Sequence, residues 1–381
     1  AEVEDGQVTY EVQNNADGPR GEDEWTIKHG KGAKTVGDKT PFTYDYVREE
    51  GLAGRMGSHL IAVVAEGPSG RLYCSPDAHQ EVAEEADHDG SVAGSVATNP
   101  RWFSPPAYGL TEFSDLFTNR QLVAMTTFSD LVAEVRERVL SDALESGLPA
   151  GQPLEDDGDG ANAYANAVAT YLTLGVSRLA DRSSSLCSWD NSRDSVRNVF
   201  GRQAIPMIWD FAEPNPFSES SGNFLGQVHW VARVVDRLPA EPPGLAVQAD
   251  ATSRDYSGKA IQTDPPYYDN IGYSDLSDFF YVWLRRSLHD FQPDLVRTML
   301  TPKAEELVAN PYRHGGREEA QQYFIDGFNQ VFAKMREQAD HSIPLTLYYA
   351  YKQQDAKDDG KSPTGWHTLL DGLIDAGWQV T

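Results

Sequence analysis

The hexapeptide Thr263–Tyr268 (TDPPYY) combines residue types that can together hold a planar amine. The preceding run Ala260–Thr263 is expected to form a short strand, which the prolines end because they lack an N–H for the ladder and fix φ. Asp264 would then lie at the carboxyl edge of a strand, where open α/β sheets bind ligands, and Tyr267 would project outward. The Asp264 carboxylate and the Pro265 carbonyl can accept both N–H bonds of an exocyclic amine while the ring stacks on its face. An ordinary turn with a packed tyrosine is the alternative for a bare motif of this kind.

The chain of 381 residues carries a formal net charge of −26, from 58 acidic and 32 basic side chains. Such a balance argues against a nucleic-acid partner, because phosphate binding needs lysines and arginines. It is also typical of a protein that works in molar salt, where a Debye length of about 3 Å screens repulsion between carboxylates. We interpret the acidity as a halophilic surface, which leaves DNA open as a partner wherever a local basic patch is present.

Two cysteines, Cys74 and Cys187, support neither a disulfide framework nor a Cys-rich metal site. No apolar stretch approaches membrane-spanning length, and no basic-then-apolar leader opens the sequence. These features predict a cytoplasmic protein in a reducing compartment, without a membrane partner. The first residue is Ala rather than Met, so we expect an excised or processed segment.

The pattern of apolar residues predicts three regions, with either one large domain or two ordinary ones. Residues 1–105 are expected to be β-rich and irregular, with a hairpin of Ile61–Ala65 and Arg71–Tyr73. Residues 106–200 are expected to be helical, with helices over Thr118–Gly147 and from about Ala161 to Ser183. The second helix should turn the following side chains inward: Tyr164, Val168, Tyr171, Leu172, Val176 and Leu179.

Residues 201–381 alternate between short apolar runs and longer helical patterns. Strands are expected at Ile205–Trp209, Leu245–Gln248, Ala260–Thr263 and Leu345–Tyr351, and another begins at Trp378. Helices are expected at Gly222–Leu238, Leu276–Leu288, Gly316–Ala339 and Trp366–Ala376. This alternation predicts an α/β domain with a mostly parallel sheet covered on both faces. Because the last strand only begins, the domain is expected to be incomplete.

The motif belongs to a longer run, Thr263–Arg286 (TDPPYYDNIGYSDLSDFFYVWLRR), which resembles the amino-group DNA methyltransferases. These enzymes methylate adenine N6 or cytosine N4 with S-adenosylmethionine. More narrowly, the chain is similar to large archaeal and bacterial adenine-specific DNA methylases, some of which carry a zinc ribbon. The resemblance covers most of residues 45–381 and includes the further stretches Tyr46–Glu66, Phe113–Val132, Arg202–Asn223 and Thr301–Gly316. The resemblance implies a partial Rossmann-like parallel sheet with a helical insertion and a β-rich N-terminal region.

The resemblance also implies roles for the motif, with Asp264, Pro265, Pro266 and Tyr267 as the catalytic set. Asp264 and the Pro265 carbonyl would hold the target amine, and Tyr267 would stack on a base flipped out of the duplex. An aniline-like nitrogen is a poor nucleophile because its lone pair is delocalised into the ring. Two acceptors on its hydrogens would free that lone pair, and Asp264 would stabilise the positive charge that develops on nitrogen.

Other polar residues are candidates for ligand contacts, each with a plainer alternative. Asp250 ends a predicted strand and would contact the cofactor, as would Asp210 and Asn215, although all three could simply initiate or cap loops. Substrate contacts are predicted for Tyr268, Asp269 and Asn270, the last two of which could instead lead into the next helix. Arg285 and Arg286 open the densest basic stretch, which continues through Arg297, Lys303, Arg313 and Arg317 and could follow a phosphate backbone. Complementing a helix dipole is the alternative for the first two arginines.

The chain departs from the family in two places. It has no glycine-rich Asp-x-Phe-x-Gly-x-Gly loop, so a separate chain or an upstream segment would have to supply that part of the cofactor site. It has Lys34–Lys39 (KTVGDK) where some relatives carry paired cysteines, so no metal is predicted. The chain could thus be a fragment, half of a split enzyme or a decayed relative.

Asp at the first motif position favours adenine N6 over cytosine N4. The alternatives are an RNA or protein-glutamine methyltransferase, and a non-catalytic interaction module of a defence or restriction-modification complex.

Overall fold

The computed structural model describes residues 2–4, 7–9, 12, 33–34, 41–77, 79–80, 92–239, 242, 244–349 and 365–381. The chain divides into two compact units. Unit 1 comprises Ala1–Leu238 and Asp278–Leu300, and unit 2 comprises Pro239–Ser277 and Thr301–Thr381. Each unit is described separately below, and the three-region division expected from the sequence stays a prediction.

The first part of unit 1 contains short antiparallel pairs. They are β1 (Glu2–Glu4) with β2 (Gln7–Thr9), β3 (Ala33–Lys34) with β4 (Pro41–Phe42), and β5 (Val63–Gly67) with β6 (Gly70–Cys74). The last pair confirms the predicted hairpin, with Val63 opposite Cys74 and Gly67 opposite Gly70. Helix α1 (Tyr44–Leu52) begins where the Thr43 hydroxyl accepts from the Tyr46 N–H. In the segment Lys34–Lys39, where some relatives carry paired cysteines, the structure describes Lys34, and residues 35–39 lie outside the described part of the chain.

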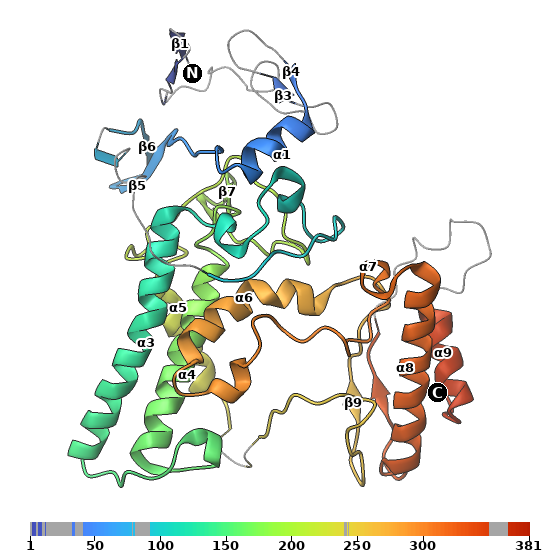
Figure 1. Ribbon diagram of the computed structural model, residues 1–381. Helices are drawn as coiled ribbons and strands as arrows, with labels where there is room; N and C mark the ends of the chain where they lie inside the picture. The colour runs from blue at the N-terminus through green and yellow to red at the C-terminus, as the bar shows by residue number, and fades with distance from the viewer. Residues whose placement is uncertain are drawn as a thin grey trace. The chain divides into compact units, whose positions relative to one another are not determined.

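Two long helices, α3 (Asn119–Glu145) and α4 (Gly160–Ala180), form the core layer of unit 1 and lie side by side (Figure 1). Helix α3 begins with a capping box, because the side chains of Thr118 and Gln121 each bond the other's backbone N–H. Helix α4 presents small residues to its neighbours, so Ala161, Ala165 and Ala169 are fully buried. Between the helices lies a 3-10 turn, η4 (Leu154–Asp156), and before them lie η2 (Pro105–Tyr108) and η3 (Phe113–Leu116).

The remainder of unit 1 packs around aromatic rings. The pair β7 (Ser188–Asp190) and β8 (Ser195–Arg197) precedes α5 (Phe224–Val235), whose Phe224 ring stacks on Phe128 of α3 at 4.2 Å. Helix α6 (Tyr273–Leu288) crosses the boundary between the units, and η5 (Pro293–Val296) follows it. Phe279 and Trp283 of α6 are fully buried against Phe117, at centroid distances of 5.6 and 5.1 Å.

Unit 2 is built on one parallel ladder and two helices. β9 (Gln262–Thr263) pairs in parallel with β10 (Thr346–Leu347). After the short α7 (Pro311–His314), α8 (Arg317–Gln338) packs beside α9 (Gly365–Asp375) in Figure 1. Their facing apolar residues, with Tyr256 and Ile261, form the core of this unit: Phe324, Phe328, Val331, Phe332, Met335, Leu369 and Leu373.

The fold expected from the sequence is wrong. The protein is mostly helical, and in its described residues the sheets are two-stranded, with no Rossmann-like parallel sheet. The six helices predicted from Thr118 onward are present with small shifts of their ends, whereas three predicted strands are absent. Ile205 makes only an isolated bridge to Phe103, because Pro206 has no N–H to donate to a ladder. Residues 245–248 and 378–380 form no β-ladder with any other described residue. Short apolar runs became strands only where a neighbouring segment supplied hydrogen bonds.

Among the described residues, no helix combines the length and apolar character needed to cross a bilayer.

Candidate functional site

The Asp-Pro-Pro-Tyr turn follows β9 directly, as the sequence predicts. The carbonyls of Ile261 and Thr263 accept from the N–H groups of Thr346 and Tyr348, at 3.0 and 2.9 Å. These bonds fix the strand on one side, and the two prolines that follow end it because they have no N–H to donate. The parallel ladder therefore ends at Thr263, and the motif begins directly after it.

Tyr268 holds the far end of this turn. Its φ of 51° is in the left-handed region, which costs a residue with a side chain roughly 1–3 kcal/mol and persists only where the surroundings impose it. The surroundings do so here: its N–H bonds the Pro266 carbonyl at 3.1 Å, and its carbonyl accepts from the Ala309 N–H at 3.1 Å. Its ring packs edge-on against Phe324 at 5.1 Å, in the core of unit 2. In this structure Tyr268 thus positions the motif; its predicted contact with substrate stays a prediction.

A cavity of about 1100 Å³ lies within unit 2, beside the motif. Its walls come from residues 248–251, residues 259–266, the first turn of α6 and the segment that follows Thr301, and α8 supplies an apolar surface. That surface consists of Phe328, Val331, Phe332 and Met335. The volume is slightly above the range of about 300–1,000 Å³ that is usual for small-molecule sites, and the cavity combines an apolar floor with many polar and charged side chains.

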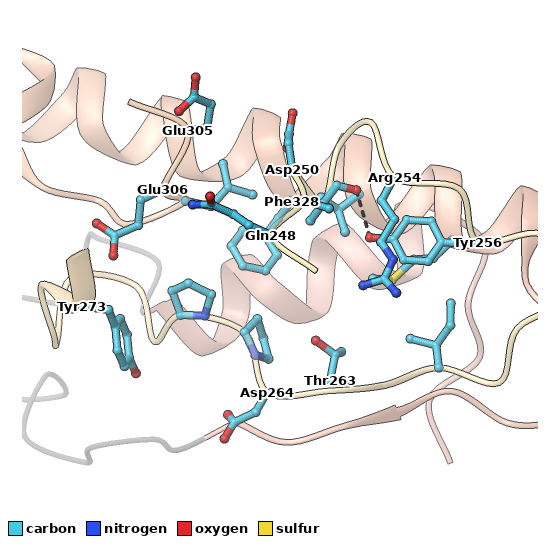
Figure 2. A pocket seen from close by; sticks show the side chains of 18 of the residues that line it. Gln248, Asp250, Arg254, Tyr256, Thr263, Asp264, Tyr273, Glu305, Glu306 and Phe328 are labelled. Atoms are coloured by element: carbon cyan, nitrogen blue, oxygen red, sulfur yellow. Dashed lines mark hydrogen bonds between the residues drawn. The ribbon is translucent and has the colours of Figure 1, made fainter. Parts of the chain in front are cut away.

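Asp264 lies at the rim of this cavity, whereas the nearby Tyr267 is not among the residues that line it. Asp264 is exposed and lines the cavity together with both prolines. In Figure 2 its carboxylate points away from Asp250, on the opposite side of the strand from the Thr263 side chain. This follows from the alternation of side chains along a strand.

The Tyr267 hydroxyl donates to Asp264 Oδ1 at 2.6 Å, and this bond raises the pKa of Tyr267 to about 12. Its ring is half-buried, edge-on to Tyr349 at 5.2 Å.

Asp250 also lines the cavity, but its carboxylate is used within its own turn. One oxygen accepts from the Thr252 N–H at 2.9 Å and the other from the Thr252 hydroxyl at 2.7 Å. These bonds hold the pKa of Asp250 below its usual value. The structure therefore brings Asp250 to the same cavity as the motif, with its acceptors already partly satisfied.

Comparison of the chain with protein-family models, with curated proteins and with solved structures gave no match.

The other predicted contacts are distributed differently. Asp210 and Asn215 belong to unit 1 and are not among the residues that line the cavity of unit 2. Asn215 caps a turn by accepting from the Phe217 N–H at 2.9 Å. Asp269 and Asn270 continue the motif and are half-buried, and the Asn270 N–H bonds the Tyr267 carbonyl at 3.0 Å.

The basic stretch is largely engaged in internal contacts. Arg286 makes a two-pronged ion pair with Asp130, with both N–O distances 2.7 Å. Arg285 is half-buried, and its Nε has no hydrogen-bond partner among the described residues. Arg313 is nearly buried between Glu306 and Asp275, at 2.7 and 3.0 Å. These pairings leave less positive charge for phosphates than the sequence alone suggests.

Three features of the site were not predicted from the sequence. Arg254 lines the cavity four residues after Asp250, in a loop where no pattern marks it. Glu306 joins the wall to the start of α6, because it accepts from the Ser274 N–H at 2.8 Å and from its hydroxyl at 2.6 Å. The apolar floor belongs to the helix predicted over Gly316–Ala339. Periodic apolar residues in a sequence indicate that one face of a helix is buried, but they do not indicate that this face lines a ligand site.

Proposed function

We propose that this protein is an S-adenosylmethionine-dependent amino-group methyltransferase that acts on DNA, with adenine N6 as the preferred target. The observation that carries the proposal is the position of Asp264–Pro266, which leave β9 and line a ligand-sized cavity. The family resemblance of the sequence supports the same function. A cytoplasmic setting and a surface adapted to high salt belong to the same proposal.

The residues of the cavity fit the proposed cofactor. Apolar side chains of α8 suit the adenine ring and the carbon chain, while Asp250, Gln248 and Arg254 offer polar contacts around them. When bound, the cofactor would supply an electrophilic methyl group. Asp264 and the two prolines line the cavity, so an amine held at Asp264 would lie beside a group held within it.

The chain's own residues would then activate the amine. The Asp264 carboxylate and the Pro265 carbonyl accept its two N–H bonds, which draws the nitrogen lone pair out of conjugation with the ring. The arriving N–H replaces the Tyr267 hydroxyl, which now occupies Asp264 Oδ1. Once released from that bond, the Tyr267 ring can stack on the face of the base. The fixed carboxylate stabilises the positive charge that develops on nitrogen.

Replacement of Asp264 by Asn tests this role. We expect Asp264→Asn to lower the rate of methyl transfer to DNA by roughly 10²–10³-fold, the usual effect of removing one preorganised electrostatic group. Asp255→Asn is the matched control, since Asp255 is an exposed carboxylate in a turn of the same unit and does not line the cavity. Equal rates for Asp264→Asn and the unaltered protein would contradict the proposal.

A second candidate is an acceptor without a phosphate backbone, such as a protein glutamine amide. The internal pairing of Arg286 and Arg313 favours it, as does the net charge of −26. Salt separates the two, because each phosphate contact gives the logarithm of the DNA binding constant a slope of about −0.9 against the logarithm of salt. A flat salt response together with methyl transfer to a peptide amide would favour the second candidate. A non-catalytic module would instead bind no S-adenosylmethionine.

A further inference from the structure

Arg254 is a cation of the cavity wall whose side chain has no partner there. Its backbone N–H bonds the Asp250 carbonyl at 2.9 Å, so that a single turn carries both residues. Figure 2 shows the two side chains leaving this turn in opposite directions, with the guanidinium extending beside Tyr256 toward Thr263. Within the described residues, the guanidinium makes no hydrogen bond or ion pair.

The other charged groups around the cavity, apart from the exposed Glu305, already make hydrogen bonds. Asp250 bonds Thr252, Asp264 accepts from Tyr267, and Glu306 binds both Arg313 and Ser274. Lys259, the second cation of the wall, donates to the Asp255 carbonyl at 3.4 Å. Of the two cations of the wall, Arg254 is therefore the one whose side chain keeps all of its donors for a ligand. A guanidinium presents its N–H groups as a planar fork that matches the two oxygens of a carboxylate.

We propose that Arg254 binds the carboxylate of the cofactor's amino-acid end; this inference rests on the proposed function. The charge of the cavity favours a carboxylate over a phosphate. Four acidic side chains line it (Asp250, Asp264, Glu305 and Glu306), and a dianionic phosphate would be repelled by them. The amino-acid end carries one carboxylate beside an ammonium group. The Arg254 guanidinium binds the carboxylate, and the acidic side chains of the wall attract the ammonium group.

The test compares binding of S-adenosylmethionine with binding of its decarboxylated analogue, measured by calorimetry. The analogue lacks the anion and is more cationic, so the acidic wall alone would favour it. We expect the unaltered protein to bind S-adenosylmethionine about tenfold more tightly than the analogue, the worth of one charged hydrogen-bonded contact. Arg254→Met should bind the two compounds equally or prefer the analogue, and Arg254→Lys should keep part of the preference.

Lys259→Met is the matched control, because it removes another positive charge from the same wall. It should retain the preference of the unaltered protein. Arg254 is exposed, so its replacement should leave the thermal unfolding midpoint unchanged, and this shows that the variant is folded.

An Arg254→Met protein that keeps the full preference would overturn the inference, as would an unaltered protein that shows none. If the unaltered protein bound neither compound, the proposed function itself would fail, which is a separate result.

Discussion

The α3–α4 layer of unit 1 and the cavity region of unit 2 are held together in different ways. In the layer, apolar and small side chains repeat along two long helices, and buried hydroxyls are satisfied within their own helix, as where Ser129 donates to the Met125 carbonyl at 2.8 Å. Around the cavity, the strands are two residues long, and segments far apart in sequence are joined by polar contacts. Arg313 binds both Glu306, which lines the cavity, and Asp275 in the first turn of α6.

This difference indicates how each region responds to change. A periodic apolar layer distributes its stability over many side chains, each of modest effect. A wall held by a few nearly buried charges depends strongly on each of them, because removing one leaves its partner desolvated and unpaired.

The largest effect is expected from Arg313→Met. Its partners Glu306 and Asp275 are only 12% and 9% exposed, so the variant removes the positive charge that lies beside two nearly buried carboxylates. We expect the free energy of unfolding of unit 2 to fall by about 3–5 kcal/mol. Arg286→Met is the matched control, because it breaks an equally short pair in which Asp130 is 56% exposed, and it should cost at most about 1 kcal/mol. Urea unfolding measures both, and equal losses would remove the contrast.

Two leucines of α3 test the apolar layer. Leu122 is 2% exposed and Leu131 is 40% exposed. Leu122→Ala should lower the free energy of unfolding by about 2–5 kcal/mol, since it removes buried methyl groups and leaves a cavity. Leu131→Ala should change it by about 0.5 kcal/mol or less. A large loss for Leu131→Ala would mean that its face of α3 is covered in solution.

The bond between Tyr267 and Asp264 predicts a pH dependence. Donation to the carboxylate raises the pKa of Tyr267 in the folded protein to about 12, above its ordinary value of 10.0. The bond's contribution to stability is therefore complete below pH 10 and lost as pH rises toward 12. Unfolding in urea at a series of alkaline pH values should show a smaller decline for Tyr267→Phe than for the unaltered protein. Identical declines would indicate that the bond is absent in solution.

The smallest effect concerns thiol reactivity. Cys187 is fully buried, and burial raises the pKa of its thiol to about 12, whereas Cys74 is exposed. A disulfide reagent at neutral pH should label Cys74 and leave Cys187 unmodified, because the thiolate is the reacting form. Both should react in denaturant. Rapid labelling of Cys187 in the native protein would show that the core of unit 1 opens readily.

Local patterns in the sequence predicted the helices well and the sheet poorly. Helices α3, α4, α5, α6 and α8 follow from apolar spacing and from caps such as Thr118, because their hydrogen bonds lie within each segment. A strand needs a partner that its own residues do not specify, and Leu245, expected in a strand, is 86% exposed. The inward face of α4 was predicted only in part. Val176 and Leu179 are fully buried as expected, but Tyr164 and Tyr171 are 54% and 40% exposed, and alanines pack inward because close helix packing favours small residues over large ones.

The candidate site also has features that follow from adjacent residues and features that depend on residues distant in sequence. The motif at the end of β9 was recognisable because prolines end a strand by their own chemistry. The role of Tyr268 in the core depends on Phe324 and Ala309, and the cavity position of Arg254 depends on the path of its loop, so neither is encoded in adjacent residues.

The most direct test of the central claim is to identify the atom that receives a methyl group. DNA is incubated with the protein and deuterium-labelled S-adenosylmethionine, digested to nucleosides and examined by mass spectrometry. We expect label on adenine N6 with the unaltered protein and with Asp255→Ala, and no label with Asp264→Ala. Label that persists with Asp264→Ala, or no label from the unaltered protein on any nucleobase amine, would contradict it.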